Sequence, residues 1–441
     1  MPLERFRFRI VAAATLAAIG ALAPLVGQAQ TLLELYDAAH AYDATYLSAR
    51  ALADSAPYRV EQTKALMRPS ASIGASPARV QTNPPIGANY SSNTIGATVS
   101  ARQPLFNRQN NATIAQSERS LESSLADLDA AEQDLVLRVS QAYFDVLGAQ
   151  DTLTTTRANK VAIAEQLASA KRNFEVGTAT ITDTREAQAR YDLATAQEIA
   201  ADNDLVTKRI ALDQLVGRKD VMPRQLAVPV VLPLPEANVD DMVARAAEQH
   251  PTVRRAQVAY DVARLETEKA RAQSLPTVDA VASYSGGRST VQANLTGNTT
   301  AASVGLQINM PLYSGGAIQN RVKETLDLEE RSRNDLEAAR RGVTQATRQA
   351  YYSILSGAAQ VKALEAAESS SKLALDATQL GYRVGIRVNV DVLNAQSQLY
   401  QTQRDLAQAR YNVLLGNLRL RQAAGQLTPS DVLAINRLLA S

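Results

Sequence analysis

The sequence carries AYFDVL at residues 142–147 and AYYSIL at residues 350–355, which are 208 positions apart. The match continues without a gap over residues 142–217 and 350–425, and a Val-Gly pair recurs inside it. A chance alignment of Ala- and Leu-rich helices does not explain glycines that recur together with the helical residues. The sequence therefore predicts one architecture that is built twice along the chain.

The first 29 residues have the pattern of a secretory signal peptide. Arg5, Arg7 and Arg9 precede an apolar run at residues 10–23, and the small residues around Ala29 suit a cleavage site. A membrane anchor is the alternative, but the apolar run is shorter than the roughly 20 residues that a span needs. We expect residues 1–29 to be removed and the chain to be exported.

The composition excludes several classes of protein. The chain has no Cys, so neither a disulfide framework nor a lipid-modified cysteine is expected. Its 46 Lys and Arg residues nearly balance 44 Asp and Glu residues, which argues against a nucleic-acid partner. It also has no Trp and only 5 Phe, which suits long helical interfaces made of Ala, Leu and Val better than an ordinary globular core.

Each half of the sequence has one region with the period of two that indicates half-buried strands. We expect a helix over residues 31–66, stopped by Pro69, then strand pairs within residues 70–104 and 276–312. The Ser-, Thr- and Gly-rich stretches at 82–94 and 285–300 predict loops. The alternating apolar positions are Ile95, Ala97, Val99, Ala101, Val278, Ala280, Ala282, Tyr284, Val304, Leu306, Ile308 and Met310.

Strands of about 10 residues with one apolar face suit a transmembrane barrel, although a soluble sandwich is the alternative. Four strands cannot close a barrel, and open strand edges are not tolerated in lipid. Three chains would supply twelve strands.

The helices that follow the strands are unusually long. Residues 107–175 and 317–382 contain no proline, and at 1.5 Å per residue each helix would span about 100 Å. Their apolar residues recur at alternating steps of three and four, as in coiled coils. A free-standing coiled coil is the alternative, but it does not account for the strands. The seam of the first helix is Ile114, Leu121, Leu125, Leu128, Leu135, Val139, Ala142, Val146, Ala149 and Leu153.

Glycine turns near residues 177 and 385 end both long helices, and a second helix follows each turn. Asp183 and Asp391 fall near the starts of these second helices, where helix capping is the structural explanation of a carboxylate. The predicted organisation is a signal peptide at 1–29, a first repeat at 30–217, a proline-rich linker at 218–235 and a second repeat at 236–441.

Several longer motifs resemble those of one known family. They are AYFDVL at 142–147, FEVGT at 174–178, ITD at 181–183, AQARYD at 187–192, LPT at 275–277, PLYSGG at 311–316, GYRVG at 381–385, VDVL at 390–393 and ARYN at 409–412. From about Leu32 to Leu439 the chain resembles the TolC family of outer-membrane channel-tunnels. The resemblance implies a mixed α and β membrane protein that forms a homotrimer. Each protomer would give four strands to a 12-stranded transmembrane barrel and its helices to a periplasmic barrel.

The resemblance implies a passive exit duct without enzymatic activity or a cofactor. Such a duct works with a periplasmic adaptor and an inner-membrane ABC or proton-driven pump. The residues agree, because the chain has no phosphate loop and only two histidines, His40 and His250. No catalytic constellation or metal site is expected, and a structural role is expected for His250.

The resemblance also assigns roles around the two turns. It implies a latch that closes the periplasmic end, formed by Tyr382, Arg387, Thr182 and Asp183, with Arg387 and Tyr382 bonding to Asp183. It implies adaptor-docking tips at Val176, Gly177, Thr178, Val384, Gly385 and Ile386.

The resemblance further implies a pore constriction at Asp391 and Asn394. Because an asparagine stands where the family pattern has a second carboxylate, weaker cation selectivity is expected. Arg172 either adds positive charge near this entrance or lies on a solvated helix face.

Two functional questions stay open at the level of sequence. A periplasmic structural coiled coil or an adaptor is the competing class, and the paired strands argue against it. Within the channel class, the missing cysteine disfavours the lipidated efflux branch. Type I protein secretion is therefore slightly favoured over drug or solvent efflux.

Overall fold

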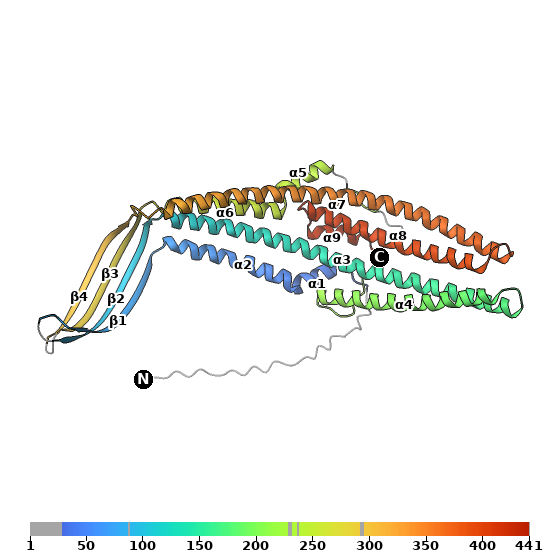
Figure 1. Cartoon of the computed structure of the whole chain (residues 1–441), viewed down its shortest axis with the longest axis horizontal. Coiled ribbons are helices and arrows are strands. Elements are labelled where there is room, and N and C mark those ends of the chain that lie inside the picture. Colours follow the sequence, from blue (N-terminus) through green and yellow to red (C-terminus); the bar gives the residue numbers. More distant parts are fainter. Residues whose placement is uncertain (1–28, 87–88, 228–231, 236–237, 292–294, 441) are drawn as a thin grey trace, which may run out of the picture.

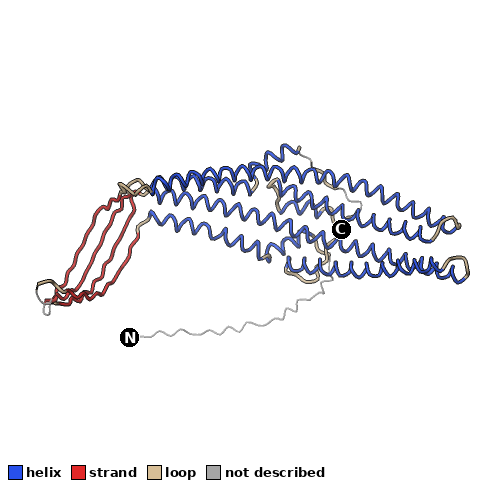
Figure 2. Tube along the Cα trace, in the orientation of Figure 1, coloured by secondary structure: helices blue, strands red, loops and turns tan. Residues whose placement is uncertain are grey.

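The structure, a computed structural model, describes residues 29–440 apart from 87–88, 228–231, 236–237 and 292–294. The predicted signal peptide lies outside the described residues except for Ala29. A sheet forms one end of an elongated molecule, and two helical hairpins form the other end (Figures 1 and 2). The described elements, in order, are α1 (Leu32–Tyr42), α2 (Ala44–Lys64), a 3-10 turn (Ala65–Met67), β1 (Ser70–Thr82), β2 (Tyr90–Phe106), α3 (Arg108–Glu175), α4 (Ile181–Val216), α5 (Val239–Gln249), α6 (Pro251–Ala272), β3 (Thr277–Val291), β4 (Leu295–Asn309), α7 (Ala317–Arg383), α8 (Asn389–Ala423) and α9 (Pro429–Asn436).

The four strands form one antiparallel sheet in the order β1-β2-β3-β4. The strands are longer than the sequence predicted, because the pairing of β3 with β4 continues from Thr277 opposite Asn309 to Val291 opposite Leu295. The expected loops at 82–94 and 285–300 were therefore wrong in extent. Backbone pairing does not require apolar side chains, and Ser- and Thr-rich segments extend a ladder beyond its apolar band.

The strand register places the predicted apolar positions on one face of this sheet. Ile73 lies opposite Val99, which lies opposite Tyr284, and this row ends at Ala302 of β4. The other face is polar, where the hydroxyl groups of Ser72 and Ser100 lie 2.8 Å apart. A sheet with one apolar and one polar face matches a barrel wall between lipid and a water-filled interior.

The long helices α3 and α7 were predicted to within about one residue at each end. Each folds back into a hairpin, with α4 against α3 and α8 against α7. Because α3 also contacts α8, the hairpin half of the molecule is a layer in the order α4-α3-α8-α7 (Figure 1). The seam prediction for α3 holds for Leu135, Val139 and Val146, which are buried, whereas Leu125 stays 45% exposed in the single chain.

The helix expected over residues 31–66 is two helices, and the break falls at Asp43. The side chain of Asp43 caps α2 by accepting a hydrogen bond from the backbone N–H of Tyr46 at 2.9 Å. Arg138 of α3 donates two further hydrogen bonds to the same carboxylate, at 3.1 and 2.8 Å. The period of 3.6 runs through such a break, so the pattern of apolar residues did not reveal it.

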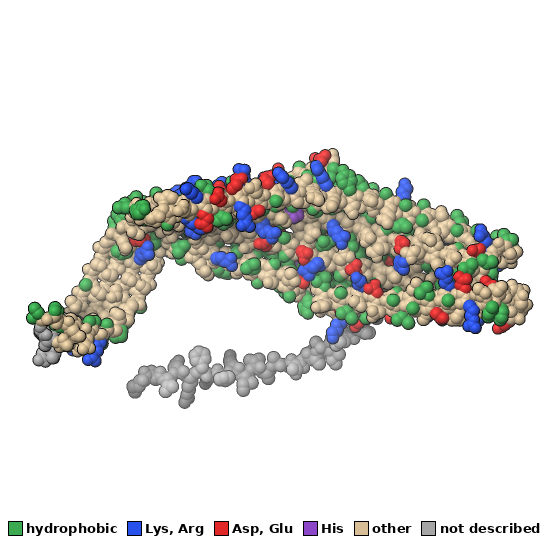
Figure 3. All heavy atoms as spheres, viewed as in Figure 1, with side chains coloured by type: hydrophobic (Ala, Val, Ile, Leu, Met, Phe, Trp, Pro, Cys, Tyr) green, Lys and Arg blue, Asp and Glu red, His purple; other side chains and the backbone are tan. Residues whose placement is uncertain are grey.

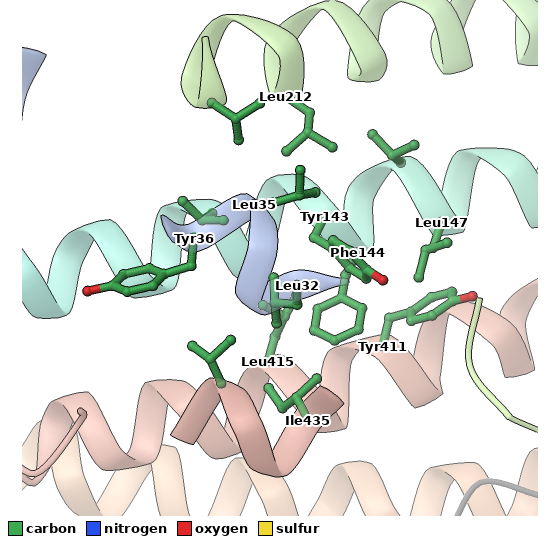
Figure 4. Close-up of a cluster of buried hydrophobic side chains, with 14 of the residues drawn as sticks. Leu32, Leu35, Tyr36, Tyr143, Phe144, Leu147, Leu212, Tyr411, Leu415 and Ile435 are labelled. Carbon is green, nitrogen blue, oxygen red and sulfur yellow. The ribbon is translucent and has the colours of Figure 1, made fainter. Parts of the chain in front are cut away.

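The largest core lies midway along the molecule, where the short helices meet α3 and α8 (Figure 4). Tyr143 and Phe144 of α3 are fully buried there, against Leu35 of α1 and Leu415 of α8. The Tyr143 hydroxyl donates a hydrogen bond of 2.6 Å to the carbonyl of Arg224, which ties the segment between the repeats to the core. The repeated AYFDVL motif therefore marks the point where the first repeat packs against the end of the second.

In each repeat, a glycine follows the second helix of the hairpin and packs against the break between the first two helices of that repeat. Gly217 and Gly425 have φ values of 68° and 67°, and a Cβ atom would lie 2.4 Å from Tyr42 at the first and 2.7 Å from His250 at the second. Only glycine fits these positions. His250 itself caps α6 by accepting a hydrogen bond from the backbone N–H of Thr252 at 3.1 Å, so it has the expected structural role.

Candidate functional site

The turns at the ends of the two hairpins have the same backbone geometry. Gly177 and Gly385 have φ values of 78° and 80°. In the first turn the N–H of Thr178 donates to the carbonyl of Asn173 at 2.8 Å, and in the second the N–H of Ile386 donates to Gly381 at 2.9 Å. This six-residue closure with a left-handed glycine is the Schellman motif, which ends a helix without strain.

The tips of these turns carry exposed apolar side chains. Val176 is 73% exposed, Val384 is 63% exposed and Ile386 is 79% exposed. Apolar side chains at the far end of a hairpin have no core of their own to enter. Such side chains suit contact with another protein, and the left-handed glycines beside them allow close backbone approach.

We name the α3–α4 pair the outer hairpin and the α7–α8 pair the inner hairpin. Asp183 of the outer hairpin takes part in a capping box at the start of α4. Its carboxylate accepts a hydrogen bond from the backbone N–H of Thr180 at 3.0 Å, and its own N–H donates to the Thr180 hydroxyl at 3.2 Å. The capping explanation of this aspartate is therefore realised. Thr182 is exposed beside it. Capping leaves other lone pairs of the carboxylate available to a further donor.

In the inner hairpin, the predicted latch residues Arg387 and Tyr382 make other contacts than the expected ones with Asp183. Arg387 forms an ion pair of 3.6 Å with Asp391, four residues further along the same chain. The Tyr382 hydroxyl accepts a hydrogen bond of 3.1 Å from the side-chain amide of Asn173 on α3. Within the described part of this single chain, neither residue is hydrogen-bonded to Asp183. The sequence reasoning missed Asn173, because nothing in its local pattern indicates a contact across 209 residues.

The two predicted constriction residues lie one turn apart at the start of α8. Asp391 is half-buried beside Arg387, and Asn394 is exposed. The side-chain oxygen of Asn394 accepts a hydrogen bond of 3.1 Å from Arg190 of α4. Arg172 is exposed near the end of α3. The unexpected Arg190 contact ties the inner hairpin to the outer one through Asn394.

The inner hairpin also buries polar side chains that the sequence analysis did not single out. Asn389 and Gln396 of α8 are each 3% exposed. Among the described residues, the amide oxygen and nitrogen of Asn389 and the amide oxygen of Gln396 have no hydrogen-bond partner. In the outer hairpin, the position equivalent to Asn389 is Ile181, which is 48% exposed. Comparison of the two copies position by position would have flagged this difference.

Neither a metal site nor a membrane-spanning helix is found in the described ranges. They contain no group of three or more His, Asp or Glu side chains arranged to hold a metal ion. They also contain no helix that is both long and apolar enough to cross a bilayer. The second histidine, His40, packs against the ring of Tyr46 with centroids 4.5 Å apart.

Comparison with known proteins identifies the family. The sequence model of the outer membrane efflux protein family matches residues 35–218 and 242–426. The chain is 32% identical over 428 residues to outer membrane protein TolC of Vibrio cholerae, covering 95% of this chain and 96% of that protein. It is 33% identical to the alkaline protease secretion protein AprF of Pseudomonas aeruginosa over 343 residues, or 76% of this chain and 70% of that protein.

Solved structures agree with this assignment at the level of fold. The outer membrane channel CmeC of Campylobacter jejuni superposes with a TM-score of 0.79 at 15% identity, covering 98% of this chain and 97% of that one. Two matched repeats, four strands and long helical hairpins all agree with the family architecture. The chain therefore belongs to the outer membrane efflux protein family, as a non-enzymatic exit duct of the outer membrane with a helical extension into the periplasm.

Proposed function

We propose that three copies of this chain form the outer-membrane exit duct of a type I protein secretion system. An inner-membrane ABC pump and a periplasmic adaptor would complete the system. The observation that carries the trimer is the set of surfaces that a single chain leaves without a partner. The sheet ends at β1 and β4, and an unpaired strand edge in lipid leaves backbone N–H and C=O groups without hydrogen bonds.

The outermost helices of the hairpin layer support the same assembly. On α4, Ile199, Val206 and Ile210 are 67%, 48% and 60% exposed and are spaced by seven and four residues. On α7, Leu373 and Leu380 are 67% and 55% exposed and are spaced by seven. Apolar residues at heptad spacing on two exposed helices favour coiled-coil packing of α4 from one copy against α7 of the next.

Two observations favour protein secretion over efflux of small compounds. The chain has no cysteine for a lipid anchor. Relatives that are 33% and 31% identical are named for protease secretion, AprF of Pseudomonas aeruginosa and PrtF of Dickeya chrysanthemi. A relative named as an efflux protein, BepC of Brucella suis, is 27% identical. Efflux with a proton-driven pump is the second candidate.

Deletion of the gene in its own host tests the choice of substrate. We expect a large secreted protein to disappear from the culture medium and to return on complementation, with little change in the growth-inhibiting concentrations of dyes and detergents. Unchanged secretion together with strong drug sensitivity would favour the efflux candidate instead.

At the hairpin tips, we propose that Tyr382, Arg387, Thr182 and Asp183 hold the periplasmic entrance closed. Arg387 is 61% exposed, so it is able to reach a carboxylate of a neighbouring copy. The exposed tips at Val176–Thr178 and Val384–Ile386 would then receive the adaptor, whose binding would compete with these weak polar links.

The latch is tested in planar bilayers with the double variant Tyr382→Phe/Arg387→Ala. Exposed polar links contribute only about 0–1 kcal/mol each, and three-fold repetition makes their loss measurable as a higher conductance. The single variant Asn173→Ala separates the contact that Tyr382 makes within the chain from contacts with a neighbour. A double variant with wild-type conductance would remove the latch from the proposal.

A further inference from the structure

Two arginines interrupt the apolar face of the sheet near the end that is distant from the helices. Arg79 follows Ile73 by six residues on β1, and Arg288 follows Tyr284 by four residues on β3, so both share the apolar face. Both side chains are exposed. In the described strands the only shift of register lies between Pro104 and Phe106, at the opposite end of the sheet.

The position of these arginines along the barrel axis matches the edge of the hydrocarbon layer of the membrane. Arg288 lies opposite Asn298 on β4, ten residues from Ile308, which is the last apolar residue within β4. Ten residues of strand rise about 34 Å. A barrel tilt of about 40° reduces this to about 26 Å, close to the apolar band of roughly 25 Å in outer-membrane barrels. Arg288 therefore lies where hydrocarbon gives way to lipid headgroups on the distal side.

Each arginine stands opposite an exposed asparagine. Arg79 pairs with Asn93 of β2, and Arg288 pairs with Asn298. Arg79 and Arg288 are two strands apart, about 10 Å across the sheet and about 7 Å along it. Two guanidinium groups at this spacing, with two amides beside them, offer several N–H donors to an anion with multiple oxygens. Figure 3 shows basic side-chain atoms at this distal end.

No carboxylate of the described strands neutralises the charge of these two arginines. Within residues 70–106 and 277–309 the charged residues are Arg79, Arg102, Asp279 and Arg288. Arg102 and Asp279 pair at 2.6 Å, on the polar face at the end near the helices. Arg79 and Arg288 form no ion pair with any residue that the structure describes. An unpaired arginine that faces lipid is costly, so a phosphate at headgroup level is a favourable partner.

We propose that Arg79 and Arg288 bind the phosphate groups of an anionic lipid in the distal leaflet of the outer membrane. Arginine is suited to phosphate because its planar guanidinium donates two parallel hydrogen bonds to the phosphate oxygens. The site lies on the outer wall of the barrel. It follows from the membrane location of the chain and is independent of what the duct exports. Occupied sites would anchor the distal rim at a fixed depth.

Native mass spectrometry of the purified full-length trimer tests this site. The protein is titrated with diphosphorylated lipid A, with the same lipid after removal of its phosphates, and with phosphatidylcholine. We expect tight binding of the diphosphorylated form alone. In Arg79→Gln/Arg288→Gln the Kd should rise about tenfold or more, and in Arg79→Lys/Arg288→Lys it should rise less, because charge remains but the paired hydrogen bonds are lost.

The matched control is Arg172→Gln/Arg383→Gln, which removes the same charge at the hairpin tips and should leave lipid A binding unchanged. Heat-resistant trimer bands verify assembly of each variant. The comparison of phosphorylated and dephosphorylated lipid on the wild-type protein needs no variant to fold. Equal affinity for both lipids, or equal loss in the tip control, would overturn the proposal and leave two arginines that simply extend into water.

Discussion

At the scale of single residues, Asn394 has a partner that alters its expected effect on the pore. Its side-chain oxygen lies 3.1 Å from a guanidinium nitrogen of Arg190 on the outer hairpin. A carboxylate at this position would pair with Arg190, and part of its charge would be neutralised. Asn394, which the family resemblance places at the pore constriction, therefore also forms a contact between the hairpins.

We predict that Asn394→Asp increases cation selectivity only partly, and that Asn394→Asp/Arg190→Gln increases it further. Carboxylate rings attract cations, and removal of Arg190 leaves the new carboxylates without a counter-charge. Reversal potentials in a KCl gradient across planar bilayers measure both effects, with Arg190→Gln alone as the control. Identical reversal potentials in all three variants would place Asn394 outside the conducting path.

Asp43 predicts a specific loss of stability in acid. The pKa of Asp43 is lowered because Arg138 donates hydrogen bonds to its carboxylate, with a further contribution from the Tyr46 N–H and the Arg138 charge, against the opposing effect of burial. A lowered folded-state pKa gives stability that is present above the unfolded pKa of about 4 and is lost as the pH falls through the folded-state value.

The variant Asp43→Asn keeps a good helix cap but loses the ion pair. We expect it to reduce the free energy of unfolding by about 1–2 kcal/mol at pH 7, after allowance for the partly exposed Arg138, and by less at pH 3. Thermal unfolding of the solubilised protein at both pH values measures the difference. An equal effect at pH 3 and pH 7 would show that the ion pair is not its cause.

At the scale of elements, the sequence predicted what its glycines, prolines and apolar periods encode. The long helices, their turns and the apolar face of the strands follow from residues such as Gly177, Gly385 and Val304. The break at Asp43 was missed, because the helical period continues through it and only the tertiary contact with Arg138 explains it. The extent of the strands was missed, because a ladder of backbone hydrogen bonds accepts Ser and Thr freely.

The candidate site was less predictable than the fold. The left-handed glycines at the tips follow from the sequence, whereas the contacts of Tyr382 with Asn173 and of Asn394 with Arg190 join residues more than 200 positions apart. Such pairs are set by how α7 and α8 pack on α3 and α4. No local pattern encodes that packing.

The buried amide of Gln396 in the inner hairpin predicts a stabilising substitution. Gln396 is buried and its amide oxygen has no partner in the described part of the chain, so Gln396→Leu should stabilise this hairpin by about 1 kcal/mol. Slower hydrogen exchange of the amides in 375–399 is the expected signal.

The duplication supplies the control for this substitution. Gln188 is the equivalent residue of the outer hairpin, and it donates a hydrogen bond of 3.0 Å to Asp192 at the surface. Gln188→Leu should therefore bring no gain. Equal protection in the two variants, or none in either, would mean that the unpaired amide is not what limits the stability of the inner hairpin.

At the scale of the whole molecule, a single chain leaves two kinds of surface uncovered. In the part of the chain that the structure describes, apolar side chains on α4 and α7 are exposed and the outer edges of β1 and β4 are unpaired. The core in the middle of the molecule, around Tyr143 and Leu415, is by contrast closed within one chain. Each chain thus has its own structural centre, and in the proposed trimer both of its ends would depend on the neighbours.

We predict that Ile199→Lys/Ile210→Lys prevents stable trimer formation. Two charges on the exposed stripe of α4 would have to be desolvated at the interface, which costs more than the lost apolar contacts alone. Heat-resistant trimer bands in membrane extracts report the result. A lysine at exposed Ala158 of α3, a helix with neighbours on both sides, is the control. Intact trimers in the α4 variant would show that this stripe lies outside the interface.

The unbroken length of α3 and α7 has a mechanical consequence. Each is a single helix of 68 or 67 residues that reaches from the sheet to a hairpin tip. The helices packed against them, α4 and α8, do not reach the sheet, because α4 stops at Gly217 and α8 is followed by Gly425. A torque applied at the tips reaches the sheet directly through the two continuous helices. Through α4 and α8 it must first cross the contacts of Gly217 with Tyr42 and of Gly425 with His250, and we expect twisting of the hairpins to be absorbed at these two contacts.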